Sequence, residues 1–158
     1  MSVTRPALEP CTIEATNRSG YPEPYRSRVL PRSKRRIGDA LGLTRIGINY
    51  TVLPPGKESS MRHWHTHEDE FVFVLEGEVV LRTQSGEQLL TAGMCAGFPA
   101  GVADGHHLIN RSAADAVYLE ISNRDAADGA RYTDPDVDLV WSPEHARGRF
   151  TRRDGSPI

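Results

Sequence analysis

The sequence predicts an all-β protein whose short antiparallel strands close into a sandwich or a barrel. From residue 46 onward, β-branched, aromatic and aliphatic residues occur in short runs, a composition typical of strands. Turn-forming residues separate the runs, as in "PPG", "SG" and "PAGVADG". No long amphipathic helical pattern lies between them, so the crossover helices of a parallel sheet are not expected.

Length and charge narrow the class of protein further. The 158 residues fit one domain with a single core. The net charge of -2, from 19 basic and 21 acidic residues, favours neither nucleic acid nor an anionic membrane as a partner. No stretch approaches the ~18 consecutive apolar residues of a spanning helix, and the N-terminal segment lacks the apolar run of a signal peptide. We therefore expect a soluble, cytoplasmic protein with a small-molecule ligand or substrate.

Residues 1–40 are expected to form an extended N-terminal arm. The first 36 residues hold five of the eleven prolines and little apolar periodicity. No aromatic residues interleave with the basic residues of this arm and no recognition helices follow, so we interpret it as solvated rather than as a nucleic-acid patch. "RIGDALGL" would form one or two helical turns. The basic residues are Arg26, Arg28, Arg32, Lys34, Arg35 and Arg36.

Residues 41–123 are expected to form the barrel core, and residues 124–158 an irregular C-terminal extension. The expected core strands are "IGINYTVL", "RHWH", "EFVFVL", "EVVLRTQ", "EQLLT", "MCAGF", "HLI" and "AVYLEIS". The extension holds one candidate strand, "VDLVW". We expect it to pack on the barrel or on a partner subunit.

Two histidines and a glutamate in "RHWHTHEDEFVFVLEG" have the spacing of a metal site. His63 and His65 lie two positions apart in a strand, so their imidazoles share one face. Glu70 opens the next strand, and a neighbouring strand lies only ~5 Å away, so its carboxylate can reach the same point. A glutamate that begins an apolar strand would otherwise be buried without a partner.

These residues resemble a known family. The first signature of the cupin superfamily is met by His63, His65, Glu70 and Gly77, while Gly56 lies one residue further from His63 than is usual. The second signature is approached by Gly93, Pro99, Gly101, His106 and Asn110. The resemblance covers residues 46–121, and two signatures in this order are more specific than either alone.

The second signature contains a departure that leaves three candidates for a fourth ligand. The usual histidine position holds Asp104, and "VADGHH" carries two extra residues. The spacing to Asn110 selects His106, and strand alternation places His106 and His107 on opposite faces. We favour His106 over Asp104 and His107, and expect Asn110 to fix a turn.

The resemblance implies a double-stranded β-helix, the jelly-roll barrel of cupins, with a metal in its mouth. In the cupin pattern three histidines and one glutamate bind a divalent first-row transition metal, which here implies His63, His65, Glu70 and His106. A mixed imidazole and carboxylate set suits iron, manganese, nickel, zinc or copper without choosing among them. The resemblance also implies a homodimer, as do apolar strands that need cover.

Function is expected to depend on residues around that metal. Open coordination positions would favour a metal-dependent enzyme acting on a small oxygen-bearing molecule. The resemblance to cupins implies dioxygenase, isomerase, lyase or decarboxylase chemistry, and the fold does not select among them. The alternative is a cupin that binds or senses a sugar or small acid without turning it over. His67 is a candidate acid or base at the rim. Tyr118 and Glu120 share a face of "AVYLEIS" and would either supply a proton or form a solvent-facing pair.

Overall fold

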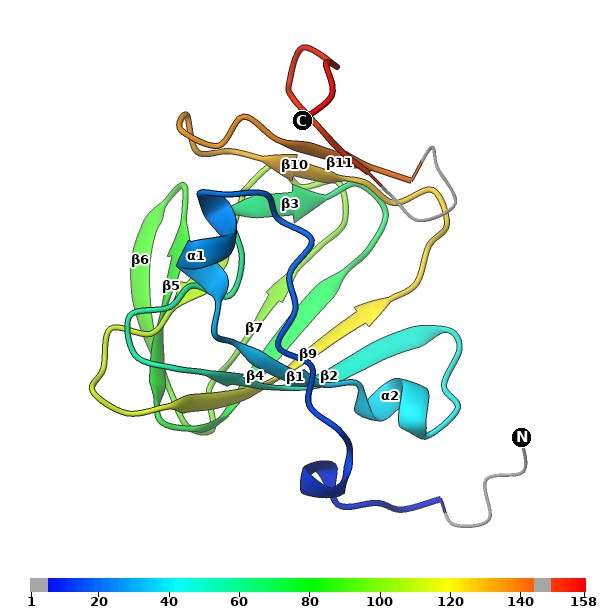
Figure 1. The fold of residues 1–158 in the computed structure, drawn as a ribbon. Coiled ribbons are helices and arrows are strands. Elements are labelled where there is room, and N and C mark those ends of the chain that lie inside the picture. Colours follow the sequence, from blue (N-terminus) through cyan, green and yellow to red (C-terminus); the bar gives the residue numbers. More distant parts are fainter. Residues whose placement is uncertain (1–5, 144–148) are drawn as a thin grey trace.

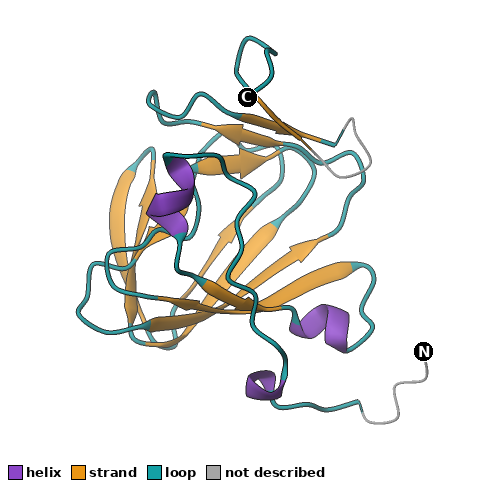
Figure 2. Cartoon of the chain, in the orientation of Figure 1, coloured by secondary structure: helices purple, strands orange, loops and turns teal. Residues whose placement is uncertain are grey.

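Strands form most of the regular structure in the computed structural model, which describes residues 6–143 and 149–158 (Figure 1, Figure 2). The helical elements are short: η1 (Pro10–Thr12), α1 (Tyr25–Val29) and α2 (Ile37–Ala40). None of the described helices has the length and apolar character needed to cross a membrane. Residues 1–5 of the expected arm and residues 144–148 of the expected extension lie outside the described residues.

The described strands form three sheets. A five-stranded sheet has the order β1 (Ser33–Arg35), β2 (Ile46–Leu53), β9 (Ala116–Asn123), β4 (Glu70–Glu76) and β7 (Cys95–Phe98). A three-stranded sheet has the order β6 (Gly86–Thr91), β5 (Glu78–Thr83) and β8 (His107–Ile109). A four-stranded sheet has the order β12 (Arg149–Thr151), β11 (Val140–Ser142), β10 (Ala130–Tyr132) and β3 (His63–His65).

This architecture confirms the predicted all-β, antiparallel jelly-roll fold. Each expected core run overlaps a strand, and β2 and β8 have the predicted bounds. Every pairing between the described strands is antiparallel. Backbone pairing does not join the three sheets into one closed barrel.

The main core is shared by the five-stranded and three-stranded sheets. Alternation along each strand sends one set of side chains inward, as in β4, where Val72 and Val74 are buried. Burial of these apolar side chains supplies the dominant favourable term for the barrel. The cluster comprises Leu53, Val72, Val74, Val79, Leu81, Leu90, Leu108, Ala116 and Tyr118.

The C-terminal extension is more regular than expected. Its strand β10 pairs with β3, so that Ala130 lies opposite His65 and Tyr132 opposite His63. These strands are three residues long, too short for a clear alternation pattern in the sequence, and pairing with β3 supplies the missing stabilisation. Figure 1 shows β10 and β11 above β3, at one end of the molecule.

The N-terminal arm also packs on the rest of the chain. It crosses in front of the five-stranded sheet between η1 and α1 and then returns to it as β1 (Figure 1). β1 pairs with β2, with Lys34 opposite Thr51. A second buried cluster joins the arm to the extension through Tyr21, Val29, Met61, Val137 and Leu139.

Asn110 fixes a turn, as expected from the sequence. Its side-chain amide is buried and donates hydrogen bonds to the carbonyl oxygens of Leu53 and Ala114. Its carbonyl oxygen accepts from the backbone N–H of Ser112. The side chain therefore holds together the end of β2 and the loop that leads into β9.

Gly77 ends β4 in a conformation that no other residue can adopt without cost. Its φ is +72°, and a Cβ there would lie 2.7 Å from the backbone oxygen of Asp115. Gly56 has a similar φ of +76°, but no described atom lies within 4 Å of an added Cβ. Alanine at either position would have to adopt a left-handed backbone conformation, which costs about 1–2 kcal/mol. We expect Gly77→Ala to lower the free energy of unfolding more than Gly56→Ala, as measured by urea midpoints; equal losses would contradict the clash.

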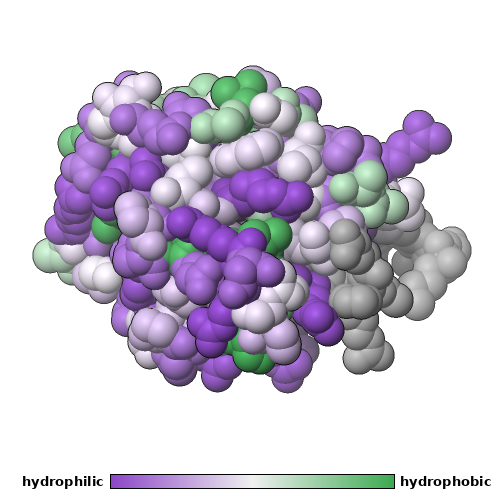
Figure 3. Space-filling model, turned by 90° about the horizontal axis from the view of Figure 1, so that it is seen from above, coloured by the Kyte–Doolittle hydropathy of each residue, from purple (hydrophilic) through white to green (hydrophobic). Residues whose placement is uncertain are grey.

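The distribution of apolar residues on the surface is relevant to the predicted homodimer. The face in Figure 3 is mostly hydrophilic, and its apolar residues are scattered. In the described chain, the large apolar side chains that are exposed include Phe71 and Leu75 of β4. The homodimer stays a prediction that a molar mass from solution scattering would check.

Candidate metal centre

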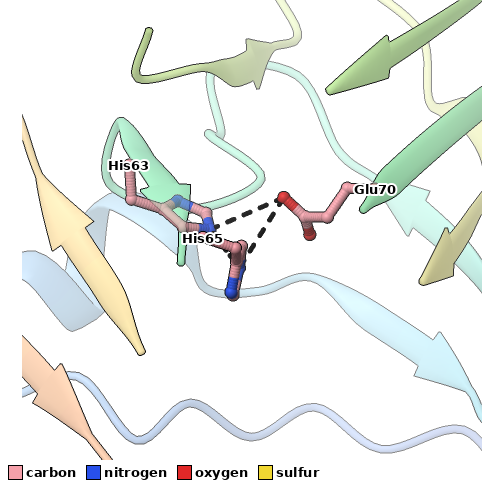
Figure 4. Close-up of side chains that lie close together, drawn as sticks. All are labelled: His63, His65 and Glu70. Carbon is pink, nitrogen blue, oxygen red and sulfur yellow. Dashed lines mark hydrogen bonds and ion pairs between the residues drawn. The ribbon is translucent and has the colours of Figure 1, made fainter. Parts of the chain in front are cut away.

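Two elements from different sheets bring the central residues of the site together. β3 directs His63 and His65 toward Glu70, the first residue of β4 (Figure 4). The Nε2 atoms of the two histidines lie 3.0 Å apart. Glu70 Oε2 lies 3.9 Å from His63 Nε2 and 3.6 Å from His65 Nε2. The predicted convergence is present, but β3 and β4 are not neighbouring strands, so the carboxylate approaches across the gap between two sheets.

Hydrogen bonds at the opposite ring nitrogens fix the orientation of both imidazoles. His63 Nδ1 lies 2.8 Å from the backbone oxygen of Met61, which can only accept. His65 Nδ1 lies 2.5 Å from Asp128 Oδ2. Both Nδ1 atoms therefore carry the proton in the neutral rings, which leaves both Nε2 lone pairs bare and facing one another. Two unprotonated imidazole nitrogens beside a carboxylate are suitable ligands for a cation. The distances between these three atoms are short enough for all of them to bind one small ion.

His106 completes the cluster from the other side of Glu70. Its Nε2 lies 2.8 Å from Glu70 Oε2, and a backbone bridge pairs it with His63. The Phe98 ring stacks on its imidazole with centroids 3.5 Å apart. Its Nδ1 is buried without a hydrogen-bond partner among the described residues, so packing rather than hydrogen bonding orients this ring.

The ionisation states of the site match those of metal ligands. Burial lowers the pKa of His63 from 6.5 to about 4, although the charge of Glu70 opposes this. Burial would raise the pKa of Glu70, but the hydrogen bond from His106 and the charges of His63 and His65 bring it down to about 2. At neutral pH His63 is therefore neutral and Glu70 is ionised, the forms that bind a metal.

The other candidate residues are not part of either group of converging ligand atoms in the described chain. His107 Nδ1 faces the backbone oxygen of Ser60 at 3.0 Å. Asp104 Oδ1 accepts a hydrogen bond from the backbone N–H of Gln84 at 2.8 Å. The exposed ring of His67 contacts the Thr66 hydroxyl through Nδ1.

Asp128 is a site residue that sequence reasoning missed. Its side chain is buried, binds His65 Nδ1, and accepts hydrogen bonds from the backbone N–H groups of His67 and Glu68. It follows the core by several residues in a polar segment with no strand or motif signal. A second group of close metal-ligand atoms joins His65, Glu68 and Asp128. Because this group shares His65 with the first, variants must distinguish the two.

Replacing Asp128 with asparagine should weaken metal binding by about 10- to 100-fold, the usual effect of losing a carboxylate that orients a ligating histidine. Asparagine keeps the size of the side chain but removes the charge that fixes the tautomer of His65. The measurement is a competition titration against a metal-binding dye. Asp125→Asn is the matched control, since Asp125 lies in the same loop and is exposed. Equal losses in the two variants would show that the loop, rather than the His65 contact, is responsible.

The metal-free protein should lose stability as the pH falls from 6.5 toward 4. In this range the unfolded chain protonates His63 and the folded chain does not, since the folded pKa is about 4. Below pH 4.5, protonation of Glu70 adds to the loss. Thermal midpoints in chelator at several pH values check this. We expect a shallower pH dependence for His63→Gln and an unchanged one for the exposed His67→Gln; a midpoint that stays constant between pH 7 and 5 would contradict the prediction.

The four clustered residues line a cavity of about 290 Å³. Tyr118 and Glu120 of β9 also line this cavity, so they are not the solvent-facing pair considered from the sequence. Tyr118 is fully buried and its hydroxyl has no hydrogen-bond partner among the described residues. Lys34 Nζ donates to Glu120 Oε2 at 2.5 Å.

Lys34 and Arg32 correct the interpretation of the arm as solvated. Both line the cavity, and Arg32 is 7% exposed. Lys34 lies in β1, the edge strand of the five-stranded sheet, and Arg32 lies directly before this strand. Burial and the charge of Arg32 lower the pKa of Lys34, while Glu120 opposes this.

Comparison with known proteins identifies similar chains. The family model described as Cupin domain matches residues 49–122. A sugar phosphate isomerase of the cupin superfamily from Silicibacter pomeroyi is 40% identical with a TM-score of 0.91, over 97% of this chain and 96% of that chain. A proposed sugar phosphate isomerase from Acidithiobacillus ferrooxidans is 28% identical with a TM-score of 0.71, over 80% of each chain. A polyketide cyclase from Streptomyces resistomycificus, 16% identical with a TM-score of 0.63 over 75% of this chain and 79% of that one, shares the fold. No curated protein matches.

Proposed function

This chain belongs to the cupin superfamily, and we propose that it is a metal-dependent enzyme that isomerises a phosphorylated sugar. The observation that carries the proposal is the convergence of bare imidazole nitrogens and an ionised carboxylate on the wall of a cavity. The proposed ligands are His63, His65, Glu70 and His106. A divalent first-row transition metal held there would polarise a carbonyl oxygen of the substrate.

Glu120 is the proposed acid and base. Isomerisation of a hydroxycarbonyl compound moves a proton from the hydroxyl-bearing carbon to the neighbouring carbonyl carbon, while the hydroxyl proton passes to the former carbonyl oxygen. The Glu120 carboxylate would accept that proton and return it, so the group ends the reaction as it began. Its contact with Lys34 at 2.5 Å holds the carboxylate in position.

Tyr118 is the proposed hydrogen-bond donor to the substrate. Burial and the charge of Glu120 raise its pKa well above its usual range, so its hydroxyl stays protonated throughout the working pH range. Its hydroxyl has no partner among the described residues and would donate to a substrate oxygen that gains negative charge.

The two similar structures with isomerase descriptions support the choice of reaction. The Silicibacter pomeroyi protein, similar over almost its full length, is a sugar phosphate isomerase. The cavity of about 290 Å³ is of a size that suits a small sugar. Dioxygenase, lyase and decarboxylase chemistry remain the other reactions that the same ligands would permit.

The test has two stages. The purified protein is first loaded with iron(II), manganese, nickel, zinc or copper, and its metal content is measured for the wild type and for His63→Ala. The loaded protein is then incubated with aldose and ketose phosphates from triose to hexose, and products are identified by NMR. We expect one bound metal per chain and interconversion of one aldose–ketose pair. Failure to retain metal under every loading condition would sink the proposal, and a sugar phosphate bound but recovered unchanged would favour the non-catalytic alternative.

A further inference from the structure

Arg32 is a buried cation without a partner among the described residues. It is 7% exposed, and its Nε is buried with no hydrogen bond to any residue that the structure describes. Within residues 6–143 and 149–158, no hydrogen bond or ion pair joins its guanidinium to another side chain. The backbone N–H of Arg32 donates a hydrogen bond to the side chain of Asn17. An unpaired charge is unfavourable in a buried position, so a bound anion would stabilise this arrangement.

The other buried charges of the described chain are compensated. Asp128 is paired with His65 at 2.5 Å. Asp134 is paired with Arg62 at 2.8 Å. Lys34, which reaches the same cavity as Arg32, is paired with Glu120. Arg32 is therefore the exception, and the missing anion is not supplied by the described residues.

The position of Arg32 connects the metal cavity with a second, larger one. The 290 Å³ cavity and a groove of about 1050 Å³ share five lining residues: Tyr21, Arg32, Lys34, Asn49 and Ser122. Arg32 also lines the smaller cavity together with His63, His65 and Glu70, so one small molecule bound there can contact all of them.

The groove is cationic. Five basic residues and two acidic ones line it, and Arg124 and Arg36 share the carboxylate of Asp39. A cleft of one sign attracts ligands of the opposite sign and raises their local concentration. The basic residues are Arg18, Arg32, Lys34, Arg36 and Arg124.

We propose that Arg32 is the binding site for the phosphate group of the substrate, which it holds while the hydroxycarbonyl end of the same molecule faces His63, His65 and Glu70. A guanidinium presents two parallel donors that match two phosphate oxygens. The site selects phosphorylated over unphosphorylated sugars, because only a phosphorylated ligand neutralises the buried charge. The assignment to a substrate rests on the proposed function, whereas the anion site itself does not.

The experiment uses inorganic phosphate as the probe and the His63→Ala background, which removes a proposed metal ligand. Thermal midpoints are measured against phosphate concentration, with chloride at matched ionic strength. We expect phosphate to raise the midpoint of the His63→Ala protein, and Arg32→Gln in that background to weaken phosphate binding by about 10- to 100-fold, the range for a charge-assisted hydrogen bond. Arg111→Gln is the matched control, since Arg111 is an exposed arginine on the three-stranded sheet side, paired with Glu87; it should respond like its parent.

Two further results separate the possible failures. Arg32→Gln should fold and be at least as stable as its parent in chloride, because it removes an unpaired buried charge. If Arg32→Gln does not fold, Arg32→Lys replaces it in the test. Lysine keeps the positive charge but lacks the two parallel donors of the guanidinium, so phosphate binding should still be weaker than in the parent. An equal response to phosphate in the Arg32 and Arg111 variants, or no response in the parent, overturns the assignment. Intact phosphate binding in a protein that turns over no sugar phosphate would count against the proposed reaction and not against this site.

Discussion

Replacing Glu70 with glutamine is expected to remove stoichiometric metal from the protein, with a loss of affinity larger than the about 100-fold that an orienting partner costs. Glu70 is the only carboxylate within 4 Å of the Nε2 atoms of His63, His65 and His106 in the described chain. Its pKa of about 2 keeps it ionised at every pH at which the protein would be loaded. Glutamine keeps the shape and removes the charge, so only the imidazoles of His63, His65 and His106 would remain as ligands in the described chain. Metal content after gel filtration measures the result.

Glu68→Gln is the control that distinguishes the two groups of possible ligands. Glu68 belongs to the second group, with His65 and Asp128, and accepts a hydrogen bond from the backbone N–H of Asp125. We expect this variant to retain its metal. Loss of metal in Glu68→Gln with retention in Glu70→Gln would move the site to the outer group and overturn the proposed ligand set.

Replacing Glu120 with glutamine should reduce kcat by about 10²- to 10⁴-fold, the usual contribution of a general acid or base, while metal content is unchanged. The amide can neither accept nor return a proton, yet it can still bind Lys34. The measurement combines kcat on the sugar phosphate identified above with metal analysis of the same sample. Glu87→Gln, an exposed glutamate paired with Arg111, should be unaffected.

Local patterns in the sequence predicted the strands and the centre of the site because both depend on neighbouring residues. Alternation along "HWH" is sufficient to place His63 and His65 on one face, and alternation along "HHLI" separates His106 from His107. Asn110, with its turn-forming amide, was likewise predictable from local chemistry.

Features that depend on pairing between residues far apart in the chain were predicted wrongly from the sequence. The basic arm was predicted to be solvated because composition does not reveal that β1 pairs with β2 or that Arg32, directly before β1, is buried. The C-terminal extension was predicted to be irregular because strands of three residues are too short to show a recognisable alternation of apolar and polar residues. Its strand β10 is stabilised by pairing with β3.

The sequence by itself therefore determined the fold class and the candidate ligands, since side-chain alternation and turn chemistry act between residues that are close in the chain. Only the tertiary structure decided what surrounds them. Asp128 reaches His65 across 63 positions, and Lys34 reaches Glu120 across 86. The physical reason is that hydrogen bonds and ion pairs across a cavity depend on how sheets pack, and that packing depends on the buried surface of the whole chain rather than on any one segment.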